Sequence, residues 1–342
     1  MKTGKAYGLG AGLLLLAASS AGCAQTKQTE VMSLKVGVTV YDQYDMFLSQ
    51  MMEHFNEYAG EVSDREGISI TIETYNAAGS QTTQNSQVET MLEQDFDVIC
   101  VNLVDRTEPV TIIDMAEKQD VPVIFFNREL VPEDLERWDR LYYVGAKAFE
   151  SGIMQGETAV RIFEEDPSAD RNEDGVFQYV VLEGEADHQD AIVRTEYSVS
   201  TIADNGVPVE KLGYAIANWS RAQAQTKMDQ LLSRYGDGIE LVLSNNDAMA
   251  LGAVDALKAA GIDREQWPVI LGIDGTDEGL EALEAGEIQG TVYNDKEGQA
   301  EAMLDLACQL TLGIVREDAE LELEDGKYVR LPYTKLEQRA ED

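Results

Sequence analysis

Short apolar runs rich in β-branched and aromatic residues alternate along the chain with longer amphipathic segments. The runs have the length and composition of buried strands, and the longer segments carry apolar residues three or four positions apart, as amphipathic helices do. The expected strands are Lys35–Tyr41, Ile68–Tyr75, Asp97–Leu103, Val121–Phe126, Arg140–Val144, Phe177–Leu182, Lys211–Ala217, Ile239–Ser244, Pro268–Ile273 and Ile288–Tyr293. The clearest helical patterns are Phe47–Tyr58, Ala222–Tyr235, Ala248–Ala260 and Gln299–Leu312.

Continuous apolar strands separated by helices are typical of parallel sheets that are covered on both faces and joined by right-handed crossovers. About ten strands exceed one comfortable sheet. The length of 342 residues also exceeds what one ordinary hydrophobic core supports. The pattern therefore predicts an α/β protein with two doubly wound parallel-sheet domains.

The carboxyl ends of the expected strands carry mostly polar planar side chains and aromatic rings. Ligands of open parallel sheets bind beyond these ends, so the residues there are candidates for a binding site. They are Tyr41–Phe47, Asn102, Asn127, Glu183–Asp190, Trp219, Asn245–Asp247, Asp274 and Asn294–Asp295. The sequence has no glycine-rich phosphate loop, dinucleotide-binding fingerprint or nucleophile elbow at these points.

These residue types suit a monosaccharide better than an anion. Carboxylates and carboxamides bind sugar hydroxyls, arginine adds a rigid fork of donors, and aromatic rings cover the C–H faces of the sugar. Arg194, which follows the Glu183–Asp190 segment, is the one cation of the proposed site. An anion site is expected to have several basic residues or clustered helix N-termini. His188 has no nearby nucleophile to activate, so the pattern predicts a binding protein that is not an enzyme.

In order and spacing, these segments resemble the bacterial galactose/glucose-binding proteins of sugar ABC transport systems, which are ribose-type periplasmic binding proteins. The resemblance extends over essentially the whole chain after its N-terminal segment. It rests on Val36–Tyr41 with Asp45 and Phe47, Val101–Asp105, Gly184-Glu185 with His188, Asp190 and Arg194, Trp219, Asn245–Ala250, Gly272–Asp274 and Gly290–Asp295. Each segment alone is a weak signal, but their combination is specific.

The resemblance implies a role for each candidate site residue. Phe47 and Trp219 are expected to sandwich the pyranose ring. Hydrogen bonds to its hydroxyls and ring oxygen are expected from Asp45, Asn102, His188, Asp190, Arg194, Asn246, Asp274 and Asn294. Simpler roles stay open for four of these residues: Asp45 and Asp190 can cap helices, Asn102 can cap a turn, and Trp219 can lie in the core.

The resemblance also implies a domain arrangement and a mechanism. An N-terminal domain of residues 34–128 plus 296–330 and a C-terminal domain of residues 129–295 plus 331–338 are expected, joined by hinge strands. β-D-galactose or β-D-glucose would bind in the cleft between them and stabilise a closed form, since periplasmic binding proteins are a recognised example of hinge closure. The protein, expected as a monomer, would then deliver the sugar to the membrane subunits of an ABC permease.

Other functions are compatible with parts of this pattern. A sensor that presents sugar to a chemoreceptor or a histidine kinase would have the same sequence features as a transport protein. A sugar-responsive repressor shares the fold but is expected to begin with a helix-turn-helix motif. A glycosidase uses paired carboxylates and would consume a glycoside, whereas a binding protein returns its ligand unchanged.

A calcium-type loop stands between two expected elements of the second domain. Oxygen ligands occupy positions 1, 3, 5 and 9 of the loop, and Gly175 occupies the sharp-turn position 6. These ligands are Asp170, Asn172, Asp174 and Gln178, with a backbone carbonyl expected from Val176. Position 12 is Val181, so the loop is not an EF-hand. The resemblance implies that Glu240 supplies the missing bidentate carboxylate and that calcium is a structural cofactor.

The N-terminal residues have the pattern of an export signal. Lys2 and Lys5 precede an apolar run that is too short to span a bilayer. Small residues then precede Cys23, which resembles a lipoprotein signal of residues 1–22 with lipid on the Cys23 sulfur, although Ser20 departs from the usual leucine. An ordinary signal peptide cut nearby is the alternative. The sequence therefore predicts an exported protein, either lipid-anchored to the outer face of the cell membrane or periplasmic.

The charge bears on possible partners, and the two remaining cysteines could form a disulfide in an exported protein. The chain has 64 Asp and Glu against 26 Lys and Arg, a formal net charge of −38. Such an excess of negative charge argues against nucleic acid as a partner, because a phosphate backbone would be repelled. Cys100 ends an apolar strand and Cys308 lies on the apolar face of a helix, so two separately buried thiols are expected rather than a disulfide.

Overall fold

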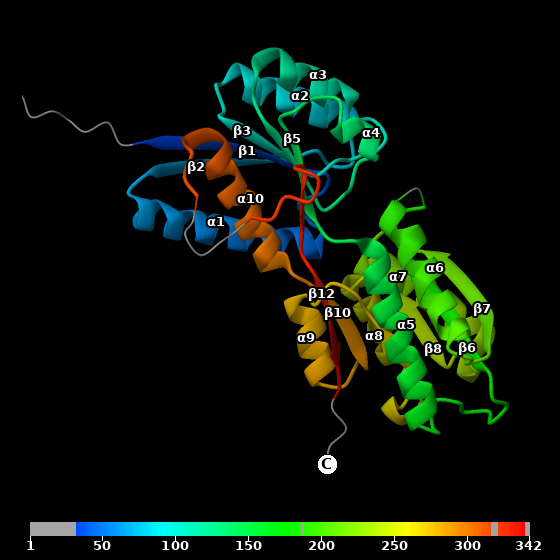
Figure 1. Ribbon diagram of the computed structural model, residues 1–342. Coiled ribbons are helices and arrows are strands. Elements are labelled where there is room, and N and C mark those ends of the chain that lie inside the picture. The colour runs from blue at the N-terminus through cyan, green and yellow to red at the C-terminus, as the bar shows by residue number, and fades with distance from the viewer. Residues whose placement is uncertain (1–31, 187, 316–320, 339–342) are drawn as a thin grey trace, which may run out of the picture. The chain divides into compact units, whose positions relative to one another are not determined.

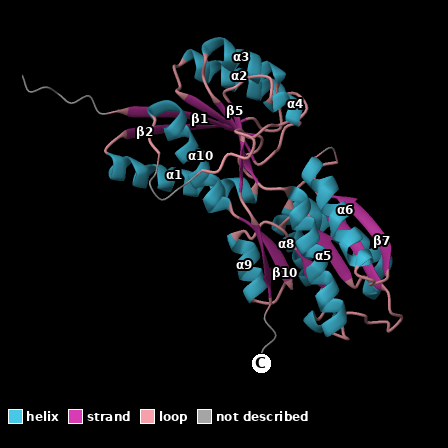
Figure 2. Ribbon diagram, viewed as in Figure 1, coloured by secondary structure: helices cyan, strands magenta, loops and turns pink. Residues whose placement is uncertain are grey.

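The computed structural model describes residues 32–186, 188–315 and 321–338. Two six-stranded sheets form its framework (Figures 1 and 2). The first sheet has the order β11-β5-β4-β3-β1-β2 and the second has the order β12-β10-β9-β8-β6-β7. Each sheet with its helices is called a lobe here. The first lobe is residues 32–145, 296–315 and 321–330, and the second lobe is residues 146–186, 188–294 and 331–338.

The strands of each sheet are short and mostly buried. The first sheet consists of β1 (Ser33–Val40), β2 (Ser69–Asn76), β3 (Val98–Val101), β4 (Val123–Phe126), β5 (Leu141–Gly145) and β11 (Tyr328–Arg330). The second consists of β6 (Phe177–Glu183), β7 (Val209–Ile216), β8 (Leu241–Ser244), β9 (Val269–Leu271), β10 (Gly290–Asn294) and β12 (Tyr333–Glu337). All neighbouring strands are parallel except β10 and β12, which are antiparallel.

Helices connect the strands and cover both faces of each sheet. They are α1 (Met46–Glu66), α2 (Gln81–Glu93), α3 (Val110–Gln119), α4 (Pro132–Leu135), α5 (Ala148–Glu165), α6 (Gln189–Asp204), α7 (Arg221–Tyr235), α8 (Asp247–Ala260), α9 (Asp277–Glu284) and α10 (Lys296–Leu312), with short 3₁₀ turns at Gly236–Gly238 and Arg264–Gln266. The two faces of one strand enter different cores. Cys100 of β3 packs with residues of α1 and α10, whereas Ile99 packs with residues of α2 and α3.

The predicted fold class is confirmed, and all ten predicted strands are present. The inner strands β3, β4 and β8 are buried at every position, which explains their continuous apolar runs. The edge strands β2 and β7 are only partly covered. Two strands near the C-terminus, β11 and β12, were not among the predicted runs. Their segments contain charged residues such as Arg330 and Lys335, since each is the last strand at one end of its sheet.

The first predicted domain boundary is corrected by the strand order. A boundary after residue 128 assigns β5 to the C-terminal domain, but β5 pairs with β4 and β11 in the first sheet. The chain therefore leaves the first lobe after Gly145. It returns between β10 and α10 and crosses again between β11 and β12. Three segments of the chain therefore connect the two lobes.

Two further sequence-based expectations concern the described residues. Cys100 and Cys308 are free and both are buried, as predicted. Among the residues that the structure describes, none of the helices is both long and apolar enough to cross a membrane. The predicted signal segment 1–22 and the lipidation site Cys23 lie outside the described residues.

Candidate functional site

A pocket between the two lobes is lined by polar and aromatic side chains from the carboxyl ends of both sheets. The first lobe contributes Tyr41, Asp45, Phe47, Asn127 and Arg128, and the second contributes His188, Asp190, Arg194, Trp219, Asn246 and Asp274. The cavity is small, about 30 Å³, and it reaches about 340 Å³ when space open to solvent is counted. The pocket is therefore narrow and partly open to solvent.

The structure brings together eight of the ten residues that were predicted to bind sugar. The other two, Asn102 and Asn294, are buried behind the pocket wall. The Nδ2 of Asn102 donates to the Oδ1 of Asn127 at 3.1 Å, and its Oδ1 accepts from the Tyr41 backbone N–H at 3.2 Å. Asn102 thus joins the ends of three strands and holds two wall residues in place.

Asp45 combines two roles at the start of α1. Its Oδ1 accepts from the backbone N–H of Leu48 at 2.9 Å, which makes it the helix N-cap. Its Oδ2 accepts from the Tyr41 hydroxyl at 2.8 Å. Burial raises the pKa of the Asp45 carboxyl, because a desolvated carboxylate is costly. The capping alternative is therefore correct, and it does not remove Asp45 from the pocket.

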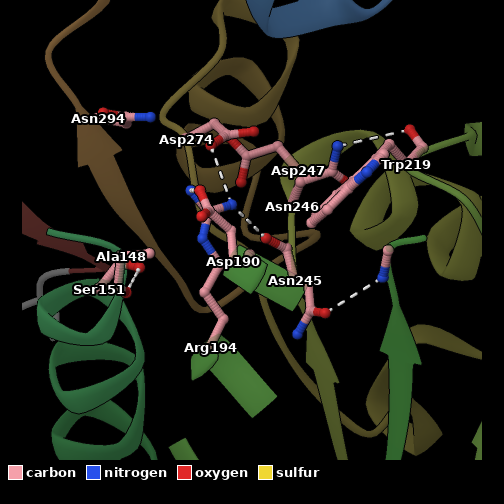
Figure 3. A network of polar contacts seen from close by, with 12 residues as sticks. Ala148, Ser151, Asp190, Arg194, Trp219, Asn245, Asn246, Asp247, Asp274 and Asn294 are labelled. Carbon is pink, nitrogen blue, oxygen red and sulfur yellow. Dashed lines mark hydrogen bonds and ion pairs between the residues drawn. The ribbon is translucent and has the colours of Figure 1, made fainter. Parts of the chain in front are cut away.

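Arg194 is the centre of a polar network in the second lobe (Figure 3). Its Nη1 donates to the carbonyl of Asn245 at 2.8 Å and lies 3.4 Å from Asp274 Oδ1. Its Nη2 lies 3.9 Å from Asp190 Oδ2. The Nε atom is buried and has no hydrogen-bond partner within the described part of the chain. An unpaired buried donor is costly, so this N–H is suited to a ligand oxygen.

The acidic neighbours of Arg194 are buried with it. Burial raises the pKa of Asp190, and the nearby Arg194 lowers it. Burial also raises the pKa of Asp274 well above its ordinary value, with Arg194 again opposing. Asp274 additionally has a φ of 116°, in the region that favours glycine. These carboxylates are held near one another at the cost of desolvation and backbone strain, which is typical of binding sites.

Asp190 is not the N-cap of α6, so the capping alternative for this residue is wrong. The N-cap is His188, whose Nδ1 accepts from the Asp190 backbone N–H at 3.1 Å. Asp190 lies in the first turn, with its carboxylate free to face the pocket. Burial and the nearby Arg128, Arg194 and Arg106 lower the pKa of His188 well below its ordinary value. His188 is therefore neutral at pH 7 and does not add to the positive charge of the site.

Trp219 is held over the pocket by an unusual turn. Its φ of 62° and that of Asn218, 51°, lie in the left-handed region, which a bulky residue rarely adopts. Its ring packs against both lobes' cores and lies edge-on to His188, with centroids 5.1 Å apart. Gly184 makes room for the ring, because a Cβ there would approach Trp219 to 2.2 Å. The core alternative is correct in part, since the ring touches both cores and the pocket.

Three wall residues were not named as ligands from the sequence. Tyr41 and Asn127 belong to the predicted strand ends, but Arg128 does not. The expectation that Arg194 is the one cation of the site is therefore wrong. Arg128 lies 3.5 Å above the Tyr41 ring centroid and 3.1 Å from Glu185 Oε2 of the other lobe. Its signal was its position, two residues after the buried strand β4.

Asp247 holds the second-lobe wall from behind. Its Oδ1 accepts from the Thr291 hydroxyl at 2.6 Å and its Oδ2 accepts from the Thr276 backbone N–H at 2.9 Å. These contacts connect the start of α8 with β10 and with the segment after Asp274. Burial raises the pKa of Asp247 to about 6, and the hydrogen bonds oppose this rise. Asn246, which caps α8 through a 2.9 Å bond from Met249 N–H, is fixed by the same arrangement.

The loop predicted to bind calcium lies directly against Glu240. Glu240 Oε1 accepts from the backbone N–H of Arg171 at 2.7 Å, and its Oε2 accepts from that of Gln178 at 3.2 Å. Asp170 Oδ2 accepts from Gly175 N–H at 2.8 Å, where φ is 75°. Within the described ranges, no group of three or more His, Cys, Asp or Glu is arranged to hold a metal ion. The side-chain oxygens of this loop instead accept hydrogen bonds from the chain.

Comparison with known sequences identifies similar proteins. A family model described as "Periplasmic binding protein domain" matches residues 36–314. The D-galactose/methyl-galactoside binding periplasmic protein MglB of Haemophilus influenzae is 36% identical over 301 residues, which cover 87% of this chain and 88% of that protein. A putative rhizopine-binding protein of Rhizobium meliloti is 30% identical, over 82% of this chain and 85% of that protein. These relatives are binding proteins, in agreement with the prediction that the chain is not an enzyme.

Solved structures extend the comparison to the fold. An ABC transporter solute binding protein from Bacillus halodurans, with bound myo-inositol, has a TM-score of 0.72 at 27% identity and covers 91% of this chain and 96% of that one. A periplasmic solute binding protein from Actinobacillus succinogenes, with bound D-allose, has a TM-score of 0.74 at 18% identity, over 89% and 98% of the two chains. At 18% identity, the similarity to the second structure is evidence for the fold alone.

Proposed function

The chain belongs to the periplasmic binding protein family, and from this premise we propose that it binds galactose or glucose in the pocket between its lobes and delivers the sugar to an ABC permease. The observation that carries the proposal is the composition of the pocket wall. Phe47 and Trp219 offer aromatic faces, while carboxylates, carboxamides and arginines offer acceptors and donors. A sugar ring needs both kinds of surface.

The charge balance of the pocket favours a neutral ligand over an anion. Arg194 lies beside Asp190 and Asp274, and Arg128 is paired with Glu185. Each cation is therefore already offset by carboxylates, and an incoming anion would meet negative charge as well. Hydroxyl groups can donate to the carboxylates and accept from the unpaired Nε of Arg194.

The choice of galactose or glucose is supported by the 36% identity to a galactose-binding relative. Isothermal titration of the purified chain with a panel of monosaccharides tests it. We expect one of these two hexoses to bind more tightly than ribose, arabinose, allose and myo-inositol. Tighter binding of another sugar would overturn the ligand assignment but keep the function, whereas no binding of any sugar or polyol would overturn the function.

Hinge closure is the proposed way in which the ligand enters and is held. Both lobes line the pocket, so a separation of the lobes would admit the sugar and a closure would enclose it. The three chain crossings allow such a motion. Small-angle scattering of the sugar-free and sugar-saturated protein tests the motion, with a smaller radius of gyration expected in the complex. Equal radii would contradict it.

We also retain calcium as a proposed structural ion of the loop 170–178. The carboxylates and carboxamides of Asp170, Asn172, Asp174 and Gln178 are the oxygen donors that calcium prefers, and Glu240 lies within hydrogen-bond distance of the loop backbone. Calcium would replace some of the present hydrogen bonds of these oxygens. The ion would tie the loop before β6 to the residue before β8, and an ion that binds only the folded chain raises its stability.

Chelation tests the calcium proposal through the melting temperature. Millimolar calcium is expected to raise the Tm of the wild type above its value in chelator, and Glu240→Gln is expected to lose most of this shift. Glu265→Gln is the matched control, because Glu265 is a nearby exposed carboxylate outside the loop. Equal Tm values with chelator and with calcium in the wild type would contradict the proposal.

Anchoring by lipid at Cys23 is proposed from the sequence pattern alone. Expression with the complete N-terminal segment, followed by detergent partition, tests it. The wild type is expected in the detergent phase and Cys23→Ser in the aqueous phase. Wild-type protein in the aqueous phase would favour the ordinary signal peptide.

A further inference from the structure

A second cavity, which we call the annex, lies beside the sugar pocket and has a volume of about 260 Å³. Its walls include Asp105 and Arg106 of the first lobe and Glu185 of the second. Arg128 and His188 line both the annex and the sugar pocket. These two side chains therefore stand between the cavities.

Arg128 is held by contacts on both sides of this partition. Its guanidinium lies 3.5 Å from the centroid of the Tyr41 ring, which lines the sugar pocket. Its Nη2 lies 3.1 Å from Glu185 Oε2, and its Nη1 donates to the Val104 carbonyl at 2.9 Å, both in annex walls. The side chain is 4% exposed. The two cavities would join only if these contacts of Arg128 were exchanged for contacts to a ligand.

The annex has a different chemistry from the sugar pocket. Among the described residues, its charged wall side chains are balanced, with Arg106 and Arg128 against Asp105 and Glu185, and His188 is neutral. Aromatic rings such as Phe47 and Trp219, which line the sugar pocket, do not occur among the described residues that line the annex. The annex therefore does not favour an anion, and it does not favour a sugar ring that binds by stacking on an aromatic side chain. An uncharged, hydroxyl-rich unit can bind to both the carboxylates and the guanidinium groups.

We propose that the annex is a second subsite, and that the chain binds disaccharides with one ring in the sugar pocket and the second ring in the annex. This inference rests on the proposed monosaccharide function and extends its ligand class. The glycosidic bond would pass the position of Arg128, whose pairing with Glu185 would be exchanged for hydrogen bonds to the ligand. Arg106 would then contact the second ring and make no contact with a monosaccharide.

Isothermal titration of the full chain with galactose, glucose and disaccharides that carry either sugar as the non-reducing ring tests the subsite. At least one disaccharide is expected to bind within about tenfold of its monosaccharide. Arg106→Ala is expected to weaken that disaccharide about tenfold, the effect of losing a hydrogen bond to a charged group, and to leave the monosaccharide unchanged. Arg137→Ala, an arginine that lines neither cavity, is the control and is expected to change neither.

Each other outcome overturns a defined part of the account. Monosaccharide binding without any disaccharide binding would overturn the subsite and leave the proposed function intact. Equal losses for both ligands in Arg106→Ala would also overturn the subsite, because the arginine would then act on the sugar pocket. If neither ligand class binds to the wild type, the proposed function fails together with the subsite.

Discussion

The two lobes contain the same turn between their second strand and the following helix, but they build it from different residues. Between β2 and α2 the first lobe has Ala78 and Gly79, with φ values of 49° and 72°. Between β7 and α7 the second lobe has Asn218 and Trp219, with φ values of 51° and 62°. The backbone is thus nearly the same, while the second turn position is glycine in one lobe and tryptophan in the other.

The residue that follows each turn is also the same. Ser80 caps α2 by accepting from Thr83 N–H, and Ser220 caps α7 by accepting from Gln223 N–H. Glycine adopts a positive φ without steric cost, whereas other residues pay roughly 1–2 kcal/mol there. The first lobe uses the residue that the turn favours. The second lobe accepts strain and thereby places an indole ring that touches both cores and the pocket, which supports the proposed stacking role of Trp219.

Of the substitutions that test this comparison of the turns, Trp219→Gly has the largest expected effect. It makes the second turn resemble the first, and sugar affinity is expected to fall by at least about 100-fold because a stacked aromatic ring is lost. Trp219→Ala is expected to lose as much affinity but to keep the backbone strain. The Gly variant should therefore be more stable than the Ala variant by about 1 kcal/mol. Titration and urea unfolding measure the two quantities, and retained affinity in either variant would place the ring outside the site.

The reciprocal change in the first lobe is the control. Gly79→Ala introduces a side chain at φ 72° where a Cβ has no neighbour within 4 Å, so strain is its main effect. A loss of roughly 1–2 kcal/mol in stability is expected, with no change in sugar affinity. A loss of affinity comparable to that of the Trp219 variants would contradict the comparison, because the turn of the first lobe would then also affect sugar binding.

Arg194→Lys tests the difference between the arginines of the two lobes. Arg194 holds Asn245 and Asp274 and has a buried Nε without a partner within the described residues. Lysine keeps the charge but not the planar fork of donors, so affinity is expected to fall by tens of fold. Arg128→Lys is the matched variant and should weaken a monosaccharide less, because its contacts are to Glu185 and Tyr41. Equal losses would contradict this ranking.

Gly184→Ala is expected to reduce sugar affinity less, because it only displaces the Trp219 ring. The added methyl group would lie 2.2 Å from the present position of Trp219 Cζ2, so the indole must move. Affinity is expected to fall about tenfold, because a well-placed contact is lost without the loss of the whole side chain. Tryptophan fluorescence would report the displacement and titration would report the affinity. An unchanged affinity would show that the exact position of the ring is unimportant.

The sequence predicted the sheets and most of the pocket for a physical reason. Buried parallel strands have continuous apolar runs, and the polar residue after such a run lies at the sheet edge where ligands bind. Asp274 and Asn246 were identified in this way. The place of Asn102 behind the wall could not be predicted, because it depends on a hydrogen bond to Asn127 across neighbouring strands.

Other features depend on contacts between distant segments. The position of Arg128 two residues after β4 marks it only weakly, and its contact with Glu185 of the other lobe could not be predicted from the sequence. The strand β12 is short and carries charged residues, so its antiparallel pairing with β10 has no periodic signal. The strain at Trp219 is likewise invisible in the sequence, although a serine follows both turns.

The pH dependence of affinity is the smallest expected effect. Burial raises the pKa values of Asp190 and Asp274 in the sugar-free protein. Sugar hydroxyls that donate to the carboxylates favour the ionised form and lower these pKa values in the complex. Binding therefore releases protons, and affinity should fall a few-fold as the pH is lowered from 7.5 towards 5.5. Affinity that rises over this range would contradict the assignment of these carboxylates as hydroxyl acceptors.

A crystal structure of the chain with the sugar that binds most tightly in the monosaccharide panel is the most direct test of the central claim. The account predicts one pyranose ring between Phe47 and Trp219, with its hydroxyls on Asp45, Asp190, Asp274 and Asn246 and one of its oxygens accepting from the Nε of Arg194. A sugar bound elsewhere, or one that leaves Trp219 and Arg194 without contacts to it, would contradict the account.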